Sequence, residues 1–136
     1  MIYAVVLMAA QCKGQSEVAK IEFTSLTRGY QKQIFIDKDS LVVLVDGRQE
    51  DNKVVKRKIA PEVWQGLVEE LKNVNIKGMG SYQSPSNRRA FDGAKHSTIK
   101  VVLSDATEVS HTFDDNEPHA DLKQLLKLIL KAENRP

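Results

Sequence analysis

The sequence has little cysteine and few aromatic residues: Cys12 is the one cysteine among 136 residues, and aromatic residues make up 6%. A single cysteine excludes an internal disulfide framework and a cysteine-rich zinc site, so packing must hold the fold together. The formal net charge of +2 is too small to indicate nucleic-acid or membrane binding by itself. After the N-terminal segment, no stretch approaches the roughly 18 apolar residues that a membrane-spanning helix needs.

The remaining composition is that of an ordinary globular protein, with 41% hydrophobic and 28% charged residues. No internal repeat or low-complexity tract divides the sequence. A chain of this length therefore predicts one domain with one core.

Residues 2–10 form an apolar run, IYAVVLMAA, near the N-terminus. Its length is typical of the hydrophobic part of a signal peptide and is about half of a bilayer crossing. Lys13 and further polar residues as far as Glu17 follow the run, as expected where an export signal gives way to mature chain. We therefore expect a signal peptide at residues 1–11.

Cys12 lies at this junction, which resembles the lipobox of bacterial lipoproteins, although Ala9 and Gln11 replace the usual Leu and small residue. The resemblance implies cleavage before Cys12, lipidation of the cysteine and membrane anchorage through residues 12–19. Two alternatives stay open. Ala9 and Ala10 suit ordinary signal-peptide cleavage, which gives a soluble secreted or periplasmic protein, and the run also suits a first buried strand or helix.

Strand-like segments follow the expected tether. Four short segments with apolar alternation or short apolar runs are separated by turn signals, at 20–24, 33–36, 41–45 and 53–59. The links between them are too short for parallel crossovers, which predicts an antiparallel meander. A hairpin is expected over Ser97–Phe113, with its register open between two turn lengths.

Two amphipathic helices complete the expected fold. Pro61 begins the first, and Gly66 within it indicates that another backbone passes close by. The second begins near Pro118 and carries a lysine on its polar face at every fourth position, at Lys123, Lys127 and Lys131. We expect an α+β domain over residues 20–136: an antiparallel sheet of about six strands, with two helices packed on one face.

The expected fourth strand is strongly basic, with Lys53, Lys56, Arg57 and Lys58. These side chains suit phosphate contacts in a cytosolic nucleic-acid-binding domain, although no aromatic platform accompanies them. Lysines on an edge strand also discourage strand-to-strand aggregation, and we favour this solvated edge.

A long connection, KGMGSYQSPSNRRAFDGAKH, spans residues 77–96. Segments of this length in a small domain are often functional, and this one offers a possible binding loop for an anionic or hydrogen-bonding ligand. A packing role is the competing interpretation, with Arg89 paired to Asp92 and Phe91 in the core. The candidate binding residues are Tyr82, Arg88, Arg89, Asp92, Lys95 and His96.

No catalytic motif is found in the sequence, and its three histidines have no metal-ligand spacing. The acidic residues Asp114, Asp115 and Glu117, with Asn116 between them, suit capping of the last helix better than a calcium loop. We therefore expect no enzymatic activity, no cofactor and no metal.

FDGA at 91–94, then a hairpin, FDDNEP at 113–118 and a Leu-rich helix resemble a group of small uncharacterised lipoproteins of the Bacteroidota. The resemblance covers about residues 20–132 and implies a place in the bacterial cell envelope. We expect a membrane-anchored binding or scaffolding protein with an envelope protein partner and no nucleic acid. A secreted inhibitor or binding module is the alternative, and a nucleic-acid-binding domain is the second.

Overall fold

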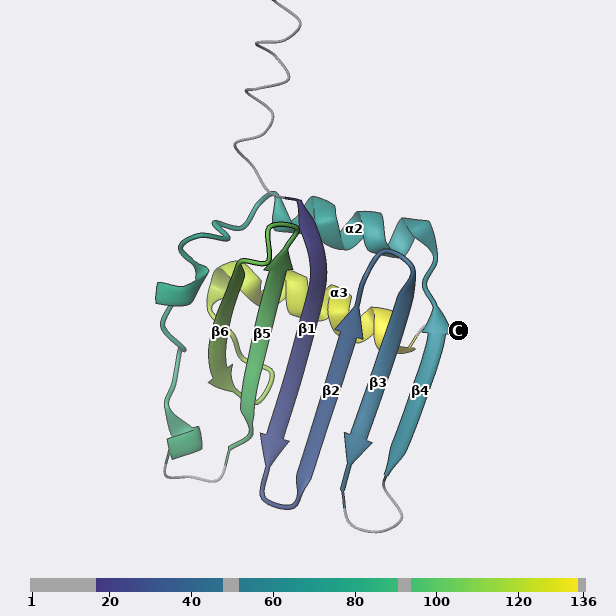
Figure 1. Cartoon of the computed structure of the whole chain (residues 1–136). Coiled ribbons are helices and arrows are strands. Elements are labelled where there is room, and N and C mark those ends of the chain that lie inside the picture. Colours follow the sequence, from purple (N-terminus) through teal and green to yellow (C-terminus); the bar gives the residue numbers. More distant parts are fainter. Residues whose placement is uncertain (1–16, 48–51, 91–93, 135–136) are drawn as a thin grey trace, which may run out of the picture.

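The computed structural model describes residues 17–47, 52–90 and 94–134. The expected signal peptide, Cys12, Phe91 and Asp92 lie outside this part of the chain. The described residues form six strands and two α-helices with three short 3₁₀ turns (Figure 1). These elements are β1 Val18–Thr27, β2 Tyr30–Ile36, β3 Ser40–Asp46, β4 Lys53–Lys58, α2 Pro61–Leu71, η1 Met79–Ser81, η2 Arg88–Ala90, β5 His96–Leu103, β6 Glu108–Asp114, η3 Ala120–Leu122 and α3 Lys123–Asn134.

The strands form one antiparallel sheet in the order β4-β3-β2-β1-β5-β6. Both α-helices lie on the same face of this sheet (Figure 1). This confirms the predicted α+β class, the two helices on one face and the order of elements along the chain. Strand β6 ends the sheet on one side, and β4 ends it on the other.

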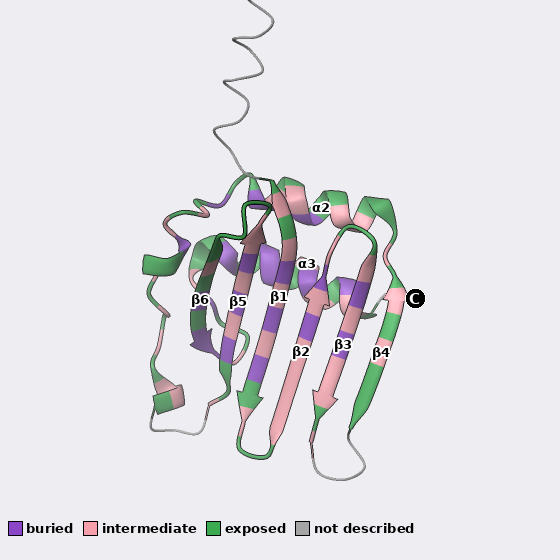
Figure 2. Ribbon diagram, viewed as in Figure 1, coloured by how far each residue is buried: buried purple, intermediate pink, exposed green. Residues whose placement is uncertain are grey.

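The sheet register places the apolar residues of neighbouring strands on the helix-covered face. Ile21 of β1 pairs with Ile36 and Val101, and Phe23 pairs with Ile34 and Ile99. Because side chains alternate between the two faces of a strand, the residues between these pairs point to the open face. Burial alternates along the strands accordingly (Figure 2).

Helix α2 begins as the sequence predicts, with Pro61 in its first turn and Glu62 beside the positive end of the helix dipole. It buries Leu67 and Leu71, and Trp64 packs against the core as a partly buried side chain. The expectation for Gly66 is wrong: a Cβ there would meet nothing within 4 Å. Gly66 instead lines a hollow of about 100 Å³ between the two helices.

Helix α3 buries Leu125, Leu126, Ile129 and Ala132, and its lysines are exposed as expected. Its C-terminal end is fixed by the sheet, because Arg57 of β4 donates hydrogen bonds to the carbonyl oxygens of Ala132, at 2.6 Å, and of Glu133. Helix C-termini leave such carbonyls unpaired, and a cation there also complements the helix dipole.

The basic strand is therefore an edge strand with two kinds of residue. Lys53, Lys56 and Lys58 are exposed, as a solvated edge requires, whereas Arg57 is half-buried and points to the face opposite to Lys56 and Lys58. Sequence inspection grouped all four residues, but alternation along β4 separates Arg57 from Lys56 and Lys58.

The sheet begins slightly earlier than the domain boundary expected at residue 20. Val18 pairs with Leu103, and the carbonyl of Glu17 accepts a hydrogen bond from Ser104 at 2.7 Å. Val18 and Ala19 therefore belong to β1, although the sequence placed them in the expected tether.

Candidate functional site

A groove of about 460 Å³ lies between the outer edge of β6 and the segment that joins α2 to β5. In Figure 1 this segment runs beside β6 from η1 to η2. Residues 110–112 of β6 form one wall, and residues from Gly80 to Arg89 form the other. The groove is the larger of the two hollows described here, and most of its lining is polar. Its lining residues are Gly80, Tyr82, Gln83, Ser84, Ser86, Asn87, Arg89, Ser110, His111 and Thr112.

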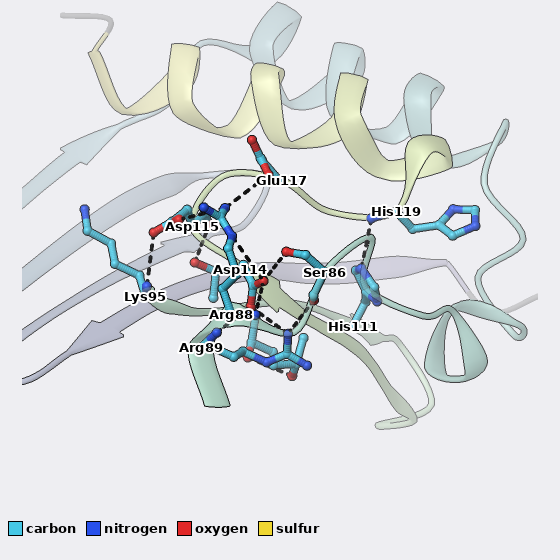
Figure 3. A network of polar contacts seen from close by, with 12 residues as sticks. Ser86, Arg88, Arg89, Lys95, His111, Asp114, Asp115, Glu117 and His119 are labelled. Carbon is cyan, nitrogen blue, oxygen red and sulfur yellow. Dashed lines mark hydrogen bonds and ion pairs between the residues drawn. The ribbon is translucent and has the colours of Figure 1, made fainter. Parts of the chain in front are cut away.

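The buried carboxylate of Asp114, at the end of β6, holds one end of the groove (Figure 3). It accepts hydrogen bonds from the hydroxyl of Ser86, from the backbone N–H groups of Arg88 and Arg89 at 2.8 and 3.1 Å, and from the Arg89 guanidinium at 2.8 Å. The two N–H groups belong to η2, so the carboxylate holds this turn directly. An interaction of this kind, between a carboxylate and several donors, is stronger than one between neutral groups.

These donors decide the ionisation of Asp114. The side chain is fully buried, and burial alone would raise its pKa. The hydrogen bonds from Ser86 and Arg89 and from the backbone of Arg88 outweigh burial and hold the pKa of Asp114 far below its ordinary value. Asp114 is therefore a structural anion that holds the segment 86–89 against the sheet.

Asp115, the next residue, holds the other end of the long connection, at Lys95. Its backbone has a φ of 49°, a left-handed conformation that Asp and Asn adopt more readily than most residues. Its side chain accepts a hydrogen bond from the N–H of Lys95 at 3.0 Å, and its N–H donates to the Lys95 carbonyl. The guanidinium of Arg88 lies 3.4 Å from the carboxylates of both Asp115 and Glu117.

Two histidines and Tyr82 form an aromatic cluster at the opposite end of the groove. The rings of Tyr82 and His119 stack with centroids 4.2 Å apart, and the His111 ring stacks on Phe113 at 5.3 Å. His111 Nε2 accepts a hydrogen bond from the backbone N–H of His119 at 3.0 Å, which requires this nitrogen to be unprotonated. His119 itself caps η3 by accepting from the N–H of Asp121.

His111 is 3% exposed, and the burial of its ring lowers its pKa below the ordinary histidine value. The nearby backbone of Tyr82 raises this pKa to a smaller extent, whereas the charges of His119 and Arg89 lower it further. His111 is thus a neutral imidazole in the wall of the groove at neutral pH.

Two buried polar atoms of the groove-lining residues have no hydrogen-bond partner among the described residues: Ser84 Oγ and His111 Nδ1. A buried polar group without a partner costs about 1–3 kcal/mol, so such groups are uncommon in folded proteins. Both atoms are buried, and both belong to residues that line one groove, which we take as the candidate binding site of the described chain.

The structure separates the six predicted binding residues. Tyr82 and Arg89 line the groove, and Arg88 lies next to it. Lys95 contributes its backbone to the Asp115 contact, and its ammonium lies 6.0 Å from the ring centre of Tyr30. His96 is exposed at the start of β5, and Asp92 lies outside the described residues.

Asp92, the expected partner of Arg89, lies outside the described residues, and among those residues the carboxylate that pairs with the Arg89 guanidinium is that of Asp114. The expectation that Asn116 or Glu117 caps the last helix is wrong, since His119 caps the η3 turn that leads into α3. Asp114 and Asp115 instead accept hydrogen bonds from the long connection.

Sequence inspection missed His111, Ser84 and Asp114 as residues of the site. His111 and Asp114 lie in a strand whose alternation suggested only packing, and Ser84 lies in a polar loop without periodicity. The one available signal was FD at Phe113 and Asp114, an aromatic residue followed by a carboxylate at the end of a predicted strand.

The described residues contain no group of three or more His, Cys, Asp or Glu side chains placed to hold a metal ion. No helix in the described part of the chain is both long enough and apolar enough to cross a bilayer. No protein-family model matches the sequence. Comparison with curated proteins gives no match either.

Proposed function

We propose that this protein is a non-catalytic binding module of the bacterial cell envelope, anchored by lipid on Cys12, that binds a protein partner in the groove beside β6. The observation that carries the binding role is the built groove, whose lining residues include two buried polar atoms without a partner. The anchor rests on the sequence alone, where a short apolar run ends two residues before the only cysteine.

The geometry of the domain supports this arrangement. Val18 lies at the end of the sheet where the β5–β6 hairpin turns, because it pairs with Leu103. A tether that precedes Val18 would join the domain at this end, whereas the groove is lined by residues 110–112 of β6, the strand at the side of the sheet. A partner would then reach the groove without contacting the end of the domain that is attached to the membrane.

The two alternatives make different use of the same features. A secreted inhibitor would use the same groove without lipid, so the chemical state of Cys12 distinguishes it from our proposal. Nucleic-acid binding through the basic strand is less well supported, because Arg57 is already bound to the end of α3.

Two experiments test the proposal. Fractionation of producing cells should place the wild-type chain in membranes, and Cys12→Ser should release a folded protein. A photo-crosslinking amino acid at Gln83, in the groove wall, should give an adduct of defined mass, whereas the same group at the exposed Gln65 of α2 should give none. Equal adducts at both positions, or none, would contradict binding in the groove.

A further inference from the structure

The imidazole of His111 connects the end of β6 with the turn that follows it (Figure 3). Its Nε2 accepts a hydrogen bond from the backbone N–H of His119 at 3.0 Å. Phe113, before the turn, and Leu122, after it, are fully buried, so the core holds the chain on both sides. The contact with His111 holds His119, which lies between them, against the sheet.

Two partly exposed rings pack around His111 at the edge of the sheet. Tyr82 meets the imidazole edge-on, with ring centres 6.2 Å apart, and Tyr82 in turn stacks on His119 at 4.2 Å. Strand β6 ends the sheet, and no strand of the described chain lies beyond it. Displacement of these two rings would therefore expose His111 to water while the core stays packed.

The groups around His111 do not stabilise a positive charge on its ring. The carboxylate of Asp114 pairs with Arg89 at 2.8 Å, and that of Asp121 accepts a hydrogen bond from the Tyr82 hydroxyl at 3.2 Å. Burial lowers the pKa of His111, and the charges of His119 and Arg89 lower it further. The titratable and charged groups around the ring are Arg89 of η2, Tyr82 of the long connection, His119 and Asp121 at η3, and Asp114 on β6 itself.

We infer that the contact between His111 and His119 is a pH-dependent switch of the groove: when His111 takes up a proton, the His119 turn and Tyr82 move away from β6. The inference rests on the proposed function and specifies how that site is regulated. Tyr82 and His111 both line the groove. Their separation would open one end of it, so acid would weaken the binding of the partner.

The switch follows from the chemistry of this hydrogen bond. A proton added to Nε2 turns the nitrogen into a donor, which then faces the N–H donor of His119. The bond is lost, and a buried cation without a counter-charge is costly. Movement of His119 away from β6 removes both costs, because each group then reaches water. Tyr82 moves too, since its ring stacks on that of His119.

The size of the effect follows from the two states of His111. In the open state the ring is solvated and has the ordinary pKa of about 6.5, whereas in the closed state it stays neutral. The population of the open state relative to the closed state therefore rises by up to about 25-fold between pH 7 and 5. Asp114 stays ionised over this range, because its pKa is held far below its ordinary value.

Hydrogen exchange of the isotope-labelled full-length chain in detergent tests the switch. Between pH 7 and 5, the protection factor of the His119 amide, corrected for intrinsic exchange, should fall at least about tenfold in the wild type. His111→Gln keeps an acceptor for this amide but takes up no proton, so its protection factor should change less than about twofold. His96→Gln changes an exposed histidine and should behave as the wild type.

The amide of Ile34, in the interior strand β2, separates local opening from global unfolding. Its protection factor should exceed that of the His119 amide at least about tenfold at both pH values. Equal factors for the two amides, or no pH dependence at His119, would overturn the switch. Both comparisons use the wild type and therefore do not depend on the folding of a variant. A pH dependence that persists in a folded His111→Gln protein would also overturn it.

The photo-crosslinking group at Gln83 tests the consequence for binding. In membranes of the producing cells held at pH 5, its adduct should decrease at least about threefold relative to pH 7 in the wild type and persist in His111→Gln. An adduct that is independent of pH would overturn regulation of the groove. If no adduct forms at either pH, the proposed function fails, while hydrogen exchange at His119 still decides whether the switch exists.

Discussion

The carboxylate of Asp114 accepts hydrogen bonds from both the guanidinium and the backbone N–H of Arg89, at 2.8 and 3.1 Å. An Asn in place of Asp114 would leave the cation of Arg89 without its counter-charge. It would also point an amide NH₂, itself a donor, towards the N–H groups that now donate to the carboxylate. Removing one partner of a buried pair is strongly destabilising. We expect Asp114→Asn to lower the melting temperature by about 10 °C, measured by circular dichroism.

The control for this variant is Asp115→Asn, one residue further on. Asn adopts the left-handed backbone of this position readily and keeps an acceptor for the N–H of Lys95. Its effect should stay within about 0.5 kcal/mol, as for most surface substitutions. Equal losses in the two variants would refute the special role of Asp114.

The same carboxylate should make stability depend on acid. The folded state holds the pKa of Asp114 below that of the unfolded chain, so the unfolded chain takes up the proton first as the pH falls. The stabilisation is complete above about pH 5 and is lost progressively below about pH 4. Urea unfolding between pH 6 and 3 should show a smaller acid-dependent loss for Asp114→Asn than for the wild type.

Protonation of His111 in the unfolded chain should cause a second loss of stability as the pH falls, in a higher pH range than that of Asp114. Its folded pKa is lowered, so the unfolded chain binds a proton more readily as the pH falls through about 6.5. Stability should therefore decrease between pH 7 and 5, and His111→Gln should remove most of this slope. His96→Gln changes an exposed histidine and should leave the slope intact; if it removes the slope instead, the assignment to His111 is wrong.

Arg57 joins the edge strand to the end of α3, and its loss should be measurable. We expect Arg57→Ala to lower the free energy of unfolding by about 1–3 kcal/mol, because two carbonyls lose a charged donor. Urea denaturation is the measurement, with Lys56→Ala as the exposed neighbour that should change little. Similar losses for both would mean that Arg57 acts only through surface charge.

Ala106, in the β5–β6 turn, has a φ of 72°, so its replacement by glycine should increase the stability of the protein. The left-handed conformation costs an L-residue about 1–2 kcal/mol, and glycine removes this strain. Glycine also has more conformational freedom in the unfolded chain, which offsets part of the stabilisation. Ala106→Gly should therefore stabilise the protein by about 0.5–1 kcal/mol in thermal unfolding. A lower melting temperature would show that this turn is not strained.

The fold could be predicted from the sequence because its elements are local. Ile21 and Phe23 alternate with polar residues, and Leu67 and Leu71 repeat at helical spacing, so each element identifies its own buried face. Short links then leave few ways to connect the strands.

The site could not be predicted in the same way because its contacts are distant in sequence. Ser86 lies 28 residues from Asp114, and Arg89 lies 25 residues from it. Composition identified the long connection as a candidate, but only the fold shows that it lies against the edge of β6 and that Asp114 holds it there.

The central claim of a lipid-anchored domain is tested most directly by the intact mass of the protein purified from membranes of its producing cells. Our account predicts a chain that begins at Cys12 and carries the mass of two or three acyl chains on that residue. An unmodified chain that retains Met1 would contradict it.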